Sequence, residues 1–453
     1  MPQLLSKLSL LALGLLCFAA CNGVVEPPVP TPTPTTPPPV PVVVSEAESH
    51  YSLTVKIKSH DTIESLETEY GGKVVIWRSE EKFAVLALDK ISGDKVASSG
   101  TTTATLESNK KVFSGSGQLA TMGGSLTAWA GGSLTAWAGG SLTAWAGGNF
   151  SFVPENTAKW QKMNLQQAQT FAANLGAGVK VAVIDSGIDL QHPAFQGGLV
   201  AASEMWDYVG NDAVPQEEGV LGTDAAYGHG TSVAGIILQI APKAKILPLR
   251  VLGSDGSGDV LNVAAAINRA IQANAKIINL SLGSDTNSQA VNDAINAATS
   301  RGIFVISSSG NTNNQNITFP ANQATSLVTN IDSYSLSVGS VDANDDKSSF
   351  STFGTTLEVV APGEQVFGPV PDNRLGAWSG TSMSAPMVSA TLALALGQTL
   401  NINWVDLTKK LKSTTVNIYK SGQNSAYKIE PTSTLLLGDG RLDINNFLNS
   451  VMQ

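Results

Sequence analysis

From Val179 onward, short apolar runs alternate with stretches whose hydrophobic positions have helical spacing. The apolar runs are 179–186, 244–252, 275–283 and 302–311, and the helical stretches are 231–240 and 260–275. Such buried runs separated by helices are typical of parallel strands joined by crossover helices. We therefore predict an α/β fold for residues 151–453, with a doubly wound, mostly parallel sheet flanked by helices. Ligands of such sheets bind beyond the carboxyl ends of the strands.

A shorter pattern precedes this region. Strict alternation of apolar and polar residues at 51–58 predicts a half-buried strand. Asp61 and Glu64 favour the start of a helix, which Gly71 and Gly72 would end. Two more strands are predicted at 73–77 and 83–88. We expect residues 46–115 to form a small α+β domain with the order strand, helix, strand, strand.

An exact repeat follows in residues 116–150. The sequence GGSLTAWA occurs at 123–130, 131–138 and 139–146. Three interpretations remain open: a flexible Gly-rich linker, a short β-meander whose Trp side chains pack on a neighbouring domain, and a Trp-based sticky or carbohydrate-binding patch. We treat the segment as a Gly/Trp repeat linker.

The first twenty residues have the pattern of a secretory signal peptide. Lys7 precedes an apolar run from Leu8 to Ala20, which is short for a bilayer span, since about 20 apolar residues are needed. Residues 21–45 follow as a spacer rich in proline, a composition that favours polyproline II. We therefore expect an exported protein.

The end of this signal resembles a bacterial lipoprotein signal. Ala19 and Ala20 precede Cys21, although Phe18 stands where Leu is usual in such signals. The resemblance implies cleavage before Cys21 and lipidation of its sulfur. The alternative is ordinary signal cleavage nearby, which would leave a free protein.

Composition narrows the function classes. Charged residues make up 14% of the chain and the net charge is −9, so a nucleic-acid partner is not expected. Both cysteines, Cys17 and Cys21, lie in the N-terminal segment. The rest of the chain therefore holds no disulfide, no thiolate metal site and no cysteine nucleophile.

Four polar residues stand at predicted element boundaries: Asp185, His229, Asn311 and Ser382. A carboxylate, an imidazole, an amide and a hydroxyl are the parts of a serine hydrolase. Each alone also fits a turn or a helix cap. His229 is the most informative, because Gly228 and Gly230 on either side allow close approach of backbone or substrate.

The motifs around these residues resemble the signature blocks of the subtilisin-like serine peptidases, the subtilases. In order along the chain they are VAVIDSGID, GHGTSVAG, INLSLGS, SSGN and GTSMSAP, and the match runs from about Val179 to Ala395. The resemblance implies a subtilisin-like fold and peptide hydrolysis through an acyl-enzyme. It assigns Ser382 as nucleophile, His229 as general base and acid, Asp185 as the group that orients the imidazole, and Asn311 as an oxyanion donor beside the Ser382 backbone N–H.

The same resemblance implies a substrate-binding edge at Ser281, Leu282 and Gly283, with Ser309 and Gly310 near the side-chain pocket. Ser308 and Ser309 stand where relatives have small apolar residues, so the pocket wall is more polar. The segment between Pro320 and Ser337 is longer than usual, which leaves the preferred side chain open.

Many relatives bind Ca²⁺, but the chemistry needs no cofactor. The acidic candidates in this chain lie in loops without a ligand pattern, so solvated charges are favoured and a structural calcium stays open. These candidates are Asp255 and Asp259, or Asp342, Asp345 and Asp346.

Subtilases are often made with a β-α-β-β propeptide that assists folding and inhibits the active site, and residues 46–115 match that pattern. We expect the partners to be polypeptide substrates, this propeptide as an intramolecular inhibitor, and a membrane through the lipid at Cys21. A cut in the repeat linker would leave the lipid with the propeptide and release the catalytic domain. We expect a monomer.

Two functions are weighed. The first is an exported serine endopeptidase in the cell envelope or surroundings of a bacterium, and the second is a catalytically inactive, surface-attached binding protein with the same fold. A lipase or esterase is disfavoured because Ser382 does not lie in a G-x-S-x-G motif.

Overall fold

The computed structural model describes residues 50–90, 104–109, 111–114, 127–128, 153–220, 223–324, 334–400, 403–420 and 422–452. The predicted signal peptide, Cys21 and the proline-rich spacer lie outside these residues, as does most of the repeat. Within the described ranges, no helix is both long and apolar enough to cross a membrane.

The N-terminal part is a small α+β unit, as its alternating pattern predicts. It contains β1 (Tyr51–Lys56), α1 (Ile63–Tyr70), β2 (Lys73–Arg78), β3 (Phe83–Leu88) and β4 (Ala104–Ser108). The strands form an antiparallel sheet in the order β2-β3-β1-β4. Helix α1 begins at Thr62, whose side chain accepts from the Ser65 N–H, rather than at the predicted Asp61. It ends, as predicted, at Gly71 with φ of 75°.

The larger part, from residue 153 onward, is built on seven parallel strands. These are β7 (Lys180–Asp185), β8 (Trp206–Asp207), β9 (Lys245–Arg250), β11 (Ile277–Leu280), β13 (Phe304–Ser308), β14 (Ser335–Val341) and β15 (Val359–Pro362). They lie in the order β15-β14-β13-β11-β7-β9-β8, and every neighbouring pair is parallel. From β7 the chain passes to β8 at one edge, returns through β9 beside β7, and then continues on the other side through β11, β13, β14 and β15. Strands are thus added on both sides of β7, which confirms the predicted doubly wound sheet.

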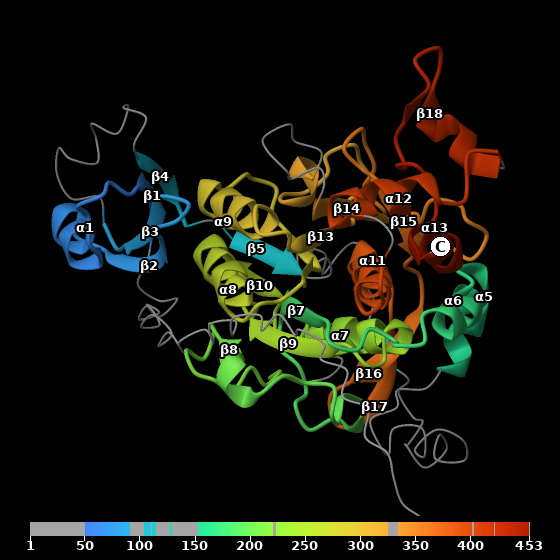
Figure 1. The fold of residues 1–453 in the computed structure, drawn as a ribbon, viewed down its shortest axis with the longest axis horizontal. Coiled ribbons are helices and arrows are strands. Elements are labelled where there is room, and N and C mark those ends of the chain that lie inside the picture. The colour runs from blue at the N-terminus through green and yellow to red at the C-terminus, as the bar shows by residue number, and fades with distance from the viewer. Residues whose placement is uncertain are drawn as a thin grey trace, which may run out of the picture. The chain divides into compact units, whose positions relative to one another are not determined.

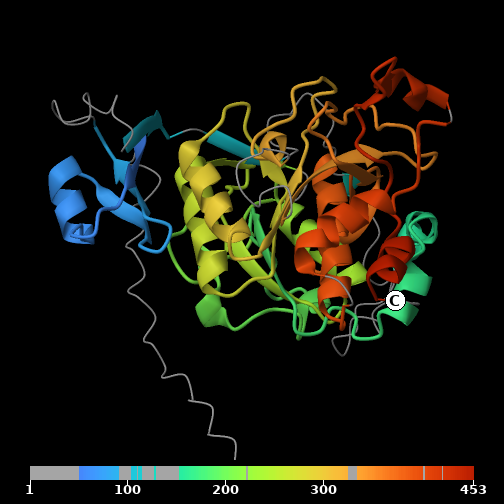
Figure 2. The same cartoon turned by 45° about the horizontal axis from the view of Figure 1, so that its top comes forward.

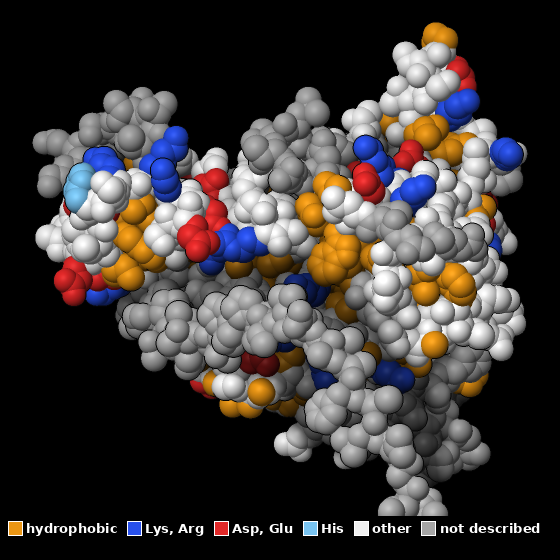
Figure 3. All heavy atoms as spheres, viewed as in Figure 1, with side chains coloured by type: hydrophobic (Ala, Val, Ile, Leu, Met, Phe, Trp, Pro, Cys, Tyr) orange, Lys and Arg blue, Asp and Glu red, His pale blue; other side chains and the backbone are white. Residues whose placement is uncertain are grey.

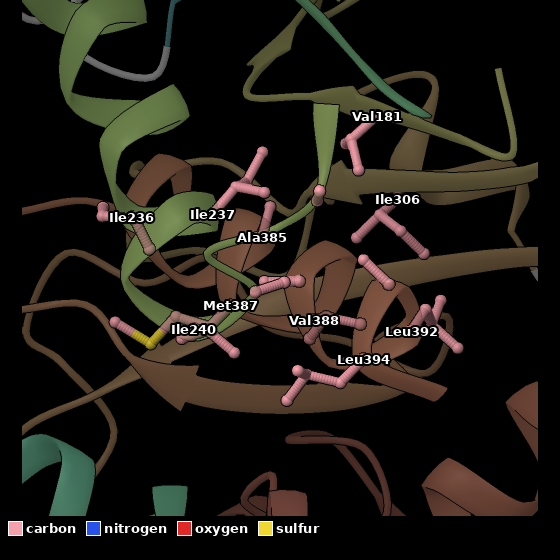
Figure 4. Packing of buried hydrophobic residues seen from close by; sticks show 14 of the residues in the cluster. Val181, Ile236, Ile237, Ile240, Ile306, Ala385, Met387, Val388, Leu392 and Leu394 are labelled. Carbon is pink, nitrogen blue, oxygen red and sulfur yellow. The ribbon is translucent and has the colours of Figure 1, made fainter. Parts of the chain in front are cut away.

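Helices cover both faces of this sheet (Figures 1 and 2). Helices α7 (His229–Ile240) and α11 (Thr381–Leu396) pack with Val181 and Val183 in one buried cluster. Helices α8 (Val260–Gln272) and α9 (Gln289–Thr299) pack with Ala182 and Ile184 in another. Successive residues of β7 thus point to opposite faces, and both faces are buried, which explains its continuous apolar run. Figure 4 shows side chains of α7 and α11 meeting Val181 and Ile306.

The first of these clusters extends to helices near the C-terminus and before β7. They are α5 (Thr157–Lys162), α6 (Leu165–Phe171), α12 (Leu407–Ser413) and α13 (Ile444–Met452). Short 3₁₀ turns occupy Pro154–Asn156, Pro193–Phe195, Ala202–Glu204, Ala321–Gln323, Trp404–Asp406 and Gly422–Tyr427. A small hairpin, β18 (Lys428–Ile429) with β19 (Thr434–Leu435), precedes α13.

Two three-stranded sheets join segments from before and after residue 153. In one, β5 (Lys111–Ser114) lies between β10 (Ser257–Asp259) and β12 (Leu282–Gly283), antiparallel to both. In the other, β6 (Thr127–Ala128) pairs with β17 (Arg374–Trp378), which also pairs with β16 (Val366–Val370). Two residues of the first GGSLTAWA copy therefore adopt strand pairing, and the other two copies lie outside the described residues.

The small N-terminal sheet packs on α8 and α9. Phe83, Val85 and Ala87 of β3 belong to the same buried cluster as α8 and α9, whereas Ala84, Leu86 and Leu88 belong to a separate cluster with α1. Both faces of β3 are therefore covered. Figure 3 shows acidic and basic side chains next to one another where this sheet meets α8 and α9, on a face that is otherwise mostly uncharged.

Candidate active site

Asp185 and His229 meet at the carboxyl end of the parallel sheet. Asp185 is the last residue of β7, and His229 is the first residue of α7. Their side chains are 1% exposed, and His229 Nδ1 lies 2.7 Å from Asp185 Oδ1. The Ser186 backbone N–H also donates to this oxygen at 2.8 Å. The carboxylate therefore fixes both the position of the imidazole and the tautomer in which Nδ1 carries the proton.

The surroundings of His229 favour its charged form. Burial alone would lower the pKa of the imidazole, but the charge and hydrogen bond of Asp185, aided by the charge of Glu217, raise it above its usual value. The edge of the ring meets Trp378, with ring centroids 5.3 Å apart. Among the described residues, His229 Nε2 has no hydrogen-bond partner. This nitrogen is therefore the one available to a substrate or a nucleophile.

Ser382 lies in the first turn of α11, next to the N-terminal end where the helix dipole is positive. Its Oγ donates to the carbonyl oxygen of Ser281 at 3.2 Å. In return, Ser281 Oγ donates to the Ser382 carbonyl at 2.8 Å and accepts from Asn279 Nδ2 at 2.9 Å. Ser389 Oγ of α11 donates to Asn279 Oδ1 at 2.8 Å. This chain of hydrogen bonds ties α11 to the end of β11.

Asn311 follows β13 and is held by the residue before Ser382. Its Oδ1 accepts from the Thr381 N–H at 2.9 Å and from Thr381 Oγ1 at 3.0 Å. Gly310 has φ of 105°, and a Cβ there would lie 2.8 Å from Thr318 Cγ2, so the turn requires glycine. A Cβ placed on Gly380 would lie 3.1 Å from Asn311 Nδ2 and 3.7 Å from the Ser382 backbone N, so both nitrogens lie close to Gly380.

The predicted substrate-binding edge is already occupied by a strand. Residues Leu282 and Gly283 pair with Ser114 and Phe113 of β5. On the other side of β5, Ser257–Asp259 pairs with residues 111–113. Val112 of β5 is 3% exposed and contributes to a pocket whose other walls include Val260, Val263 and Leu282. The sequence analysis did not predict β5, because four residues without alternation give no clear strand signal.

The predicted side-chain pocket is described only in part. Ser309 is buried, and its Oγ donates to the Thr352 carbonyl at 3.1 Å. Its hydroxyl is therefore bound within the protein. Gly310 N–H donates to Thr381 Oγ1 at 3.2 Å. Most of the long segment after Pro320 that bears on side-chain preference, residues 325–333, lies outside the described residues.

The acidic candidates for calcium make local contacts. Asp259 caps α8 and accepts from the Asn262 N–H at 3.0 Å, and Asp255 accepts from the Ser257 N–H at 2.9 Å. Asp345 forms ion pairs with Lys162 and Arg441 at 3.1 and 2.8 Å. In the described part of the chain, no three histidine, cysteine or acidic side chains gather as a metal site. The carboxylates of Asp255, Asp259 and Asp345 therefore bind donors and cations of the protein itself.

One buried acid near the site was missed. Glu217 lies beside Ser186 and Thr231 and is 2% exposed. In the sequence it is one of two adjacent glutamates in VPQEEG, and no motif distinguishes it from Glu218. Only its burial in the folded chain identifies it.

Comparisons with known proteins identify the family of this chain. A family model described as "Subtilase family" matches residues 176–434. Thermitase of Thermoactinomyces vulgaris is 34% identical over 284 residues, which cover 60% of this chain and 89% of that protein. Subtilisin BL of Lederbergia lenta is 35% identical over 263 residues, which cover 54% of this chain and 88% of that protein.

Proposed function

Because the chain belongs to the subtilase family, we propose that it is an exported serine endopeptidase with Ser382 as nucleophile, His229 as general base and acid, and Asp185 as the group that orients the imidazole. The buried hydrogen bond of 2.7 Å between His229 and Asp185 carries the proposal. It engages Nδ1 and leaves Nε2 to receive a proton.

In the proposed reaction, Ser382 Oγ attacks the carbonyl carbon of a peptide bond while its proton passes to His229 Nε2. The tetrahedral intermediate collapses, the C–N bond breaks, and Nε2 gives the proton to the leaving amine. Water then attacks the acyl-enzyme with the same base, and Ser382 is restored. The Ser382 hydroxyl must first leave the Ser281 carbonyl, to which it donates at 3.2 Å, since catalytic hydrogen bonds often tighten only in the substrate complex.

The intermediate carries a negative charge on the former carbonyl oxygen. We propose that Asn311 Nδ2 and the Ser382 N–H donate to it, because hydrogen bonds from Thr381 hold the Asn311 amide beside the residue that precedes Ser382, and both nitrogens lie close to Gly380. Thr381 donates two hydrogen bonds to Asn311 Oδ1, so the NH₂ group at the other end of the Asn311 amide points away from Thr381. Fixed donors of this kind need no reorganisation as charge develops.

The strand β5 supports the proposal that residues 46–115 are an inhibitory propeptide. It lies between β10 and β12 as the central strand of an antiparallel sheet, which is how an extended polypeptide substrate would bind. Its buried Val112 side chain lines a pocket together with Val260 and Leu282. The protein's own chain thus fills the position of a substrate.

Polar contacts fix the small N-terminal sheet against the catalytic part. Arg78 Nη1 donates to Asn268 Oδ1 of α8 at 3.1 Å. Glu107 Oε2 accepts from the Gln289 N–H at 2.8 Å and from Ser288 Oγ at 3.2 Å, at the N-terminus of α9. A carboxylate there complements the helix dipole. These contacts would position β5 in the cleft.

The pairing register suggests which bond is cut. Phe113 pairs with Gly283 and Ser114 with Leu282, so β5 runs toward Ser281, whose carbonyl contacts the Ser382 hydroxyl. Gly115 itself lies outside the described residues. We propose that the Gly115–Ser116 bond is the maturation site, which lies at the boundary between the propeptide and the repeat linker rather than within a repeat.

Export and anchoring remain proposals that rest on the sequence. We propose that residues 1–20 are removed, that Cys21 is lipidated, and that the cut after Gly115 separates the anchored propeptide from the catalytic domain. Recovery of active enzyme in membranes with its N-terminus at Cys21 would contradict this order of events.

The proposed function is tested by labelling the purified protein with a fluorescent fluorophosphonate at neutral pH. We expect labelling of the wild type and of Ser300→Ala, an exposed serine at the end of α9, and none of Ser382→Ala. A folded wild type that does not react would instead favour the inactive binding protein. N-terminal sequencing of the same samples should give Ser116 for the wild type and an uncut chain for Ser382→Ala.

A further inference from the structure

A second buried carboxyl group lies next to the Asp185–His229 pair and takes no part in the reaction proposed above. Glu217 Oε1 lies 2.5 Å from Ser186 Oγ. Its Oε2 accepts from the Thr231 N–H at 3.2 Å and also from the Thr231 hydroxyl. Glu217 therefore links the residue after β7 to the first turn of α7, the two segments that carry Asp185 and His229.

The Ser186 hydroxyl stands between the two carboxyl groups. Its Oγ lies 3.2 Å from Asp185 Oδ1 and 2.5 Å from Glu217 Oε1, and it accepts from the Gly230 N–H at 2.9 Å. A hydroxyl has one proton to donate. It can therefore donate to Asp185 or to Glu217, but not to both at once.

We propose that Glu217 is a positioning residue that selects, through Ser186, between two hydrogen-bonding states of Asp185; this inference rests on the proposed function. When Glu217 is ionised, Ser186 donates to Glu217. When Glu217 is protonated, it donates to Ser186 Oγ, which then donates to Asp185 Oδ1. In the second state Asp185 shares its charge with a further donor, so it attracts the imidazolium form of His229 less strongly.

Both states are accessible near neutrality. Burial raises the pKa of Glu217 to about 7, and the charge of Asp185 adds to the rise, while the bonds from Ser186, Thr231 and the Gly228 backbone oppose it. Glu217 therefore gains its proton in the range in which a histidine titrates. Protonation removes a negative charge near His229 and adds a donor to Asp185, and both changes lower the pKa of the imidazole.

Among the residues that the structure describes, no cation is paired with the Glu217 carboxylate. Arg250, at the end of β9, donates to the Gln216 backbone at 3.3 Å, but its charge is bound by Asp207 at 2.9 Å and Glu218 at 3.0 Å. Trp378, on the other side of His229, is uncharged. The titratable and charged groups around the cluster are Asp185, Asp189, Asp207, Glu218, Tyr227, His229, Arg250, Asp372 and Arg374.

The proposal predicts that acid inactivation is spread over a wider pH range than one histidine would give. As the pH falls, Glu217 takes up a proton and makes His229 a weaker base. More of the imidazole then stays neutral and competent at a given pH. The acid limb of kcat/KM should therefore contain two coupled ionisations.

The test compares the pH dependence of kcat/KM for the mature wild type, Glu217→Gln and Glu218→Gln. Glutamine keeps the shape of Glu217 and can donate to Ser186, which fixes the state that protonated Glu217 adopts. An opposite charge within about 4–6 Å shifts a pKa by about 1–3 units. Because Glu217 acts across Ser186, we expect the acid limb of Glu217→Gln to move down by about half a unit and to fit one ionisation.

Glu218→Gln is the matched control, because it removes the same charge from the next residue, whose side chain is 71% exposed. Its acid limb should coincide with that of the wild type. The proposal is overturned if Glu217→Gln is folded and active with an unchanged acid limb. It is equally overturned if Glu217→Gln loses the same fraction of activity at every pH, which would indicate a structural role alone.

A second readout does not depend on turnover. The His229 imidazole is titrated by NMR in Ser382→Ala and in Ser382→Ala with Glu217→Gln. We expect the second protein to have the lower His229 pKa, and equal values would overturn the proposal. If the wild type fails to react with a fluorophosphonate, the proposed function fails, whereas the NMR comparison still reports on Glu217.

Discussion

Replacing Asn311 by leucine removes one of the two donors that face the developing oxyanion and keeps a side chain of similar volume. The substitution leaves the Ser382 N–H as the other donor, which lies close to Gly380 as Asn311 Nδ2 does. Loss of one such donor costs about 10²–10³ in kcat, or about 2.7–4 kcal/mol of transition-state stabilisation. Because the donor acts mainly on the transition state, we expect KM to change by less than about threefold.

The assay measures kcat and KM on a chromogenic peptide, with the enzyme concentration set by fluorophosphonate titration. Asn316→Leu is the control, because Asn316 is exposed in the same loop. It should retain wild-type kcat. A thermal melt verifies that Asn311→Leu is folded, since Thr381 loses its acceptor. If folded Asn311→Leu retains more than about a tenth of wild-type kcat, the oxyanion assignment is wrong.

Three further predictions concern pH and the propeptide. Since the pKa of His229 is raised, the midpoint of the acid limb of kcat/KM should lie above about pH 6.5. A midpoint below about pH 6.5 would contradict the argument that Asp185 raises this pKa. Asp185→Asn should lower kcat by about 10⁴. The pKa of Glu217 is about 7 in the folded protein and 4.5 when the side chain is exposed. Between these values the group is protonated in the fold and ionised in the unfolded chain, so it makes the wild type less stable as the pH rises from 4.5 to about 7. Chemical denaturation should show that the free energy of unfolding of Glu217→Gln rises by about 3 kcal/mol relative to that of the wild type between pH 5 and 8. An equal difference at both pH values would refute the argument that burial raises the pKa of Glu217. Val112→Asp adds one negative charge at a buried position of β5 and should slow autoprocessing about tenfold or more. Lys110→Gln, outside the described residues, makes the net charge more negative by the same one unit and serves as the comparison on a gel time course. Equal rates would show that β5 does not present the bond.

The sheet and its helices could be predicted from the sequence because their signals are strong. Strand β7 is buried on both faces by α7 and α8, so its apolar run is continuous. Strand β5 could not be predicted, because its partners are Ser257–Asp259 and Leu282–Gly283, more than a hundred residues away. A strand stabilised by distant edges carries little information in its own four residues.

The residues of the candidate site also differ in whether the sequence alone could indicate them. Asp185, His229, Asn311 and Ser382 could be singled out because each stands at an element boundary beside a recognisable motif, and the fold brings these boundaries to one end of the sheet. Glu217 could not be distinguished from Glu218 in the sequence, although one is 2% and the other 71% exposed in the fold. Its contacts come from Ser186 and Thr231, which lie within two different motifs. Burial of this kind follows only from tertiary structure.

The most direct test of the account is mass spectrometry of the fluorophosphonate adduct of the mature enzyme. We predict one adduct per molecule, on the peptide that contains Ser382, with its formation lost in His229→Ala. An adduct on another serine, or unchanged labelling of His229→Ala, would contradict the assignment of Ser382 as a nucleophile activated by His229.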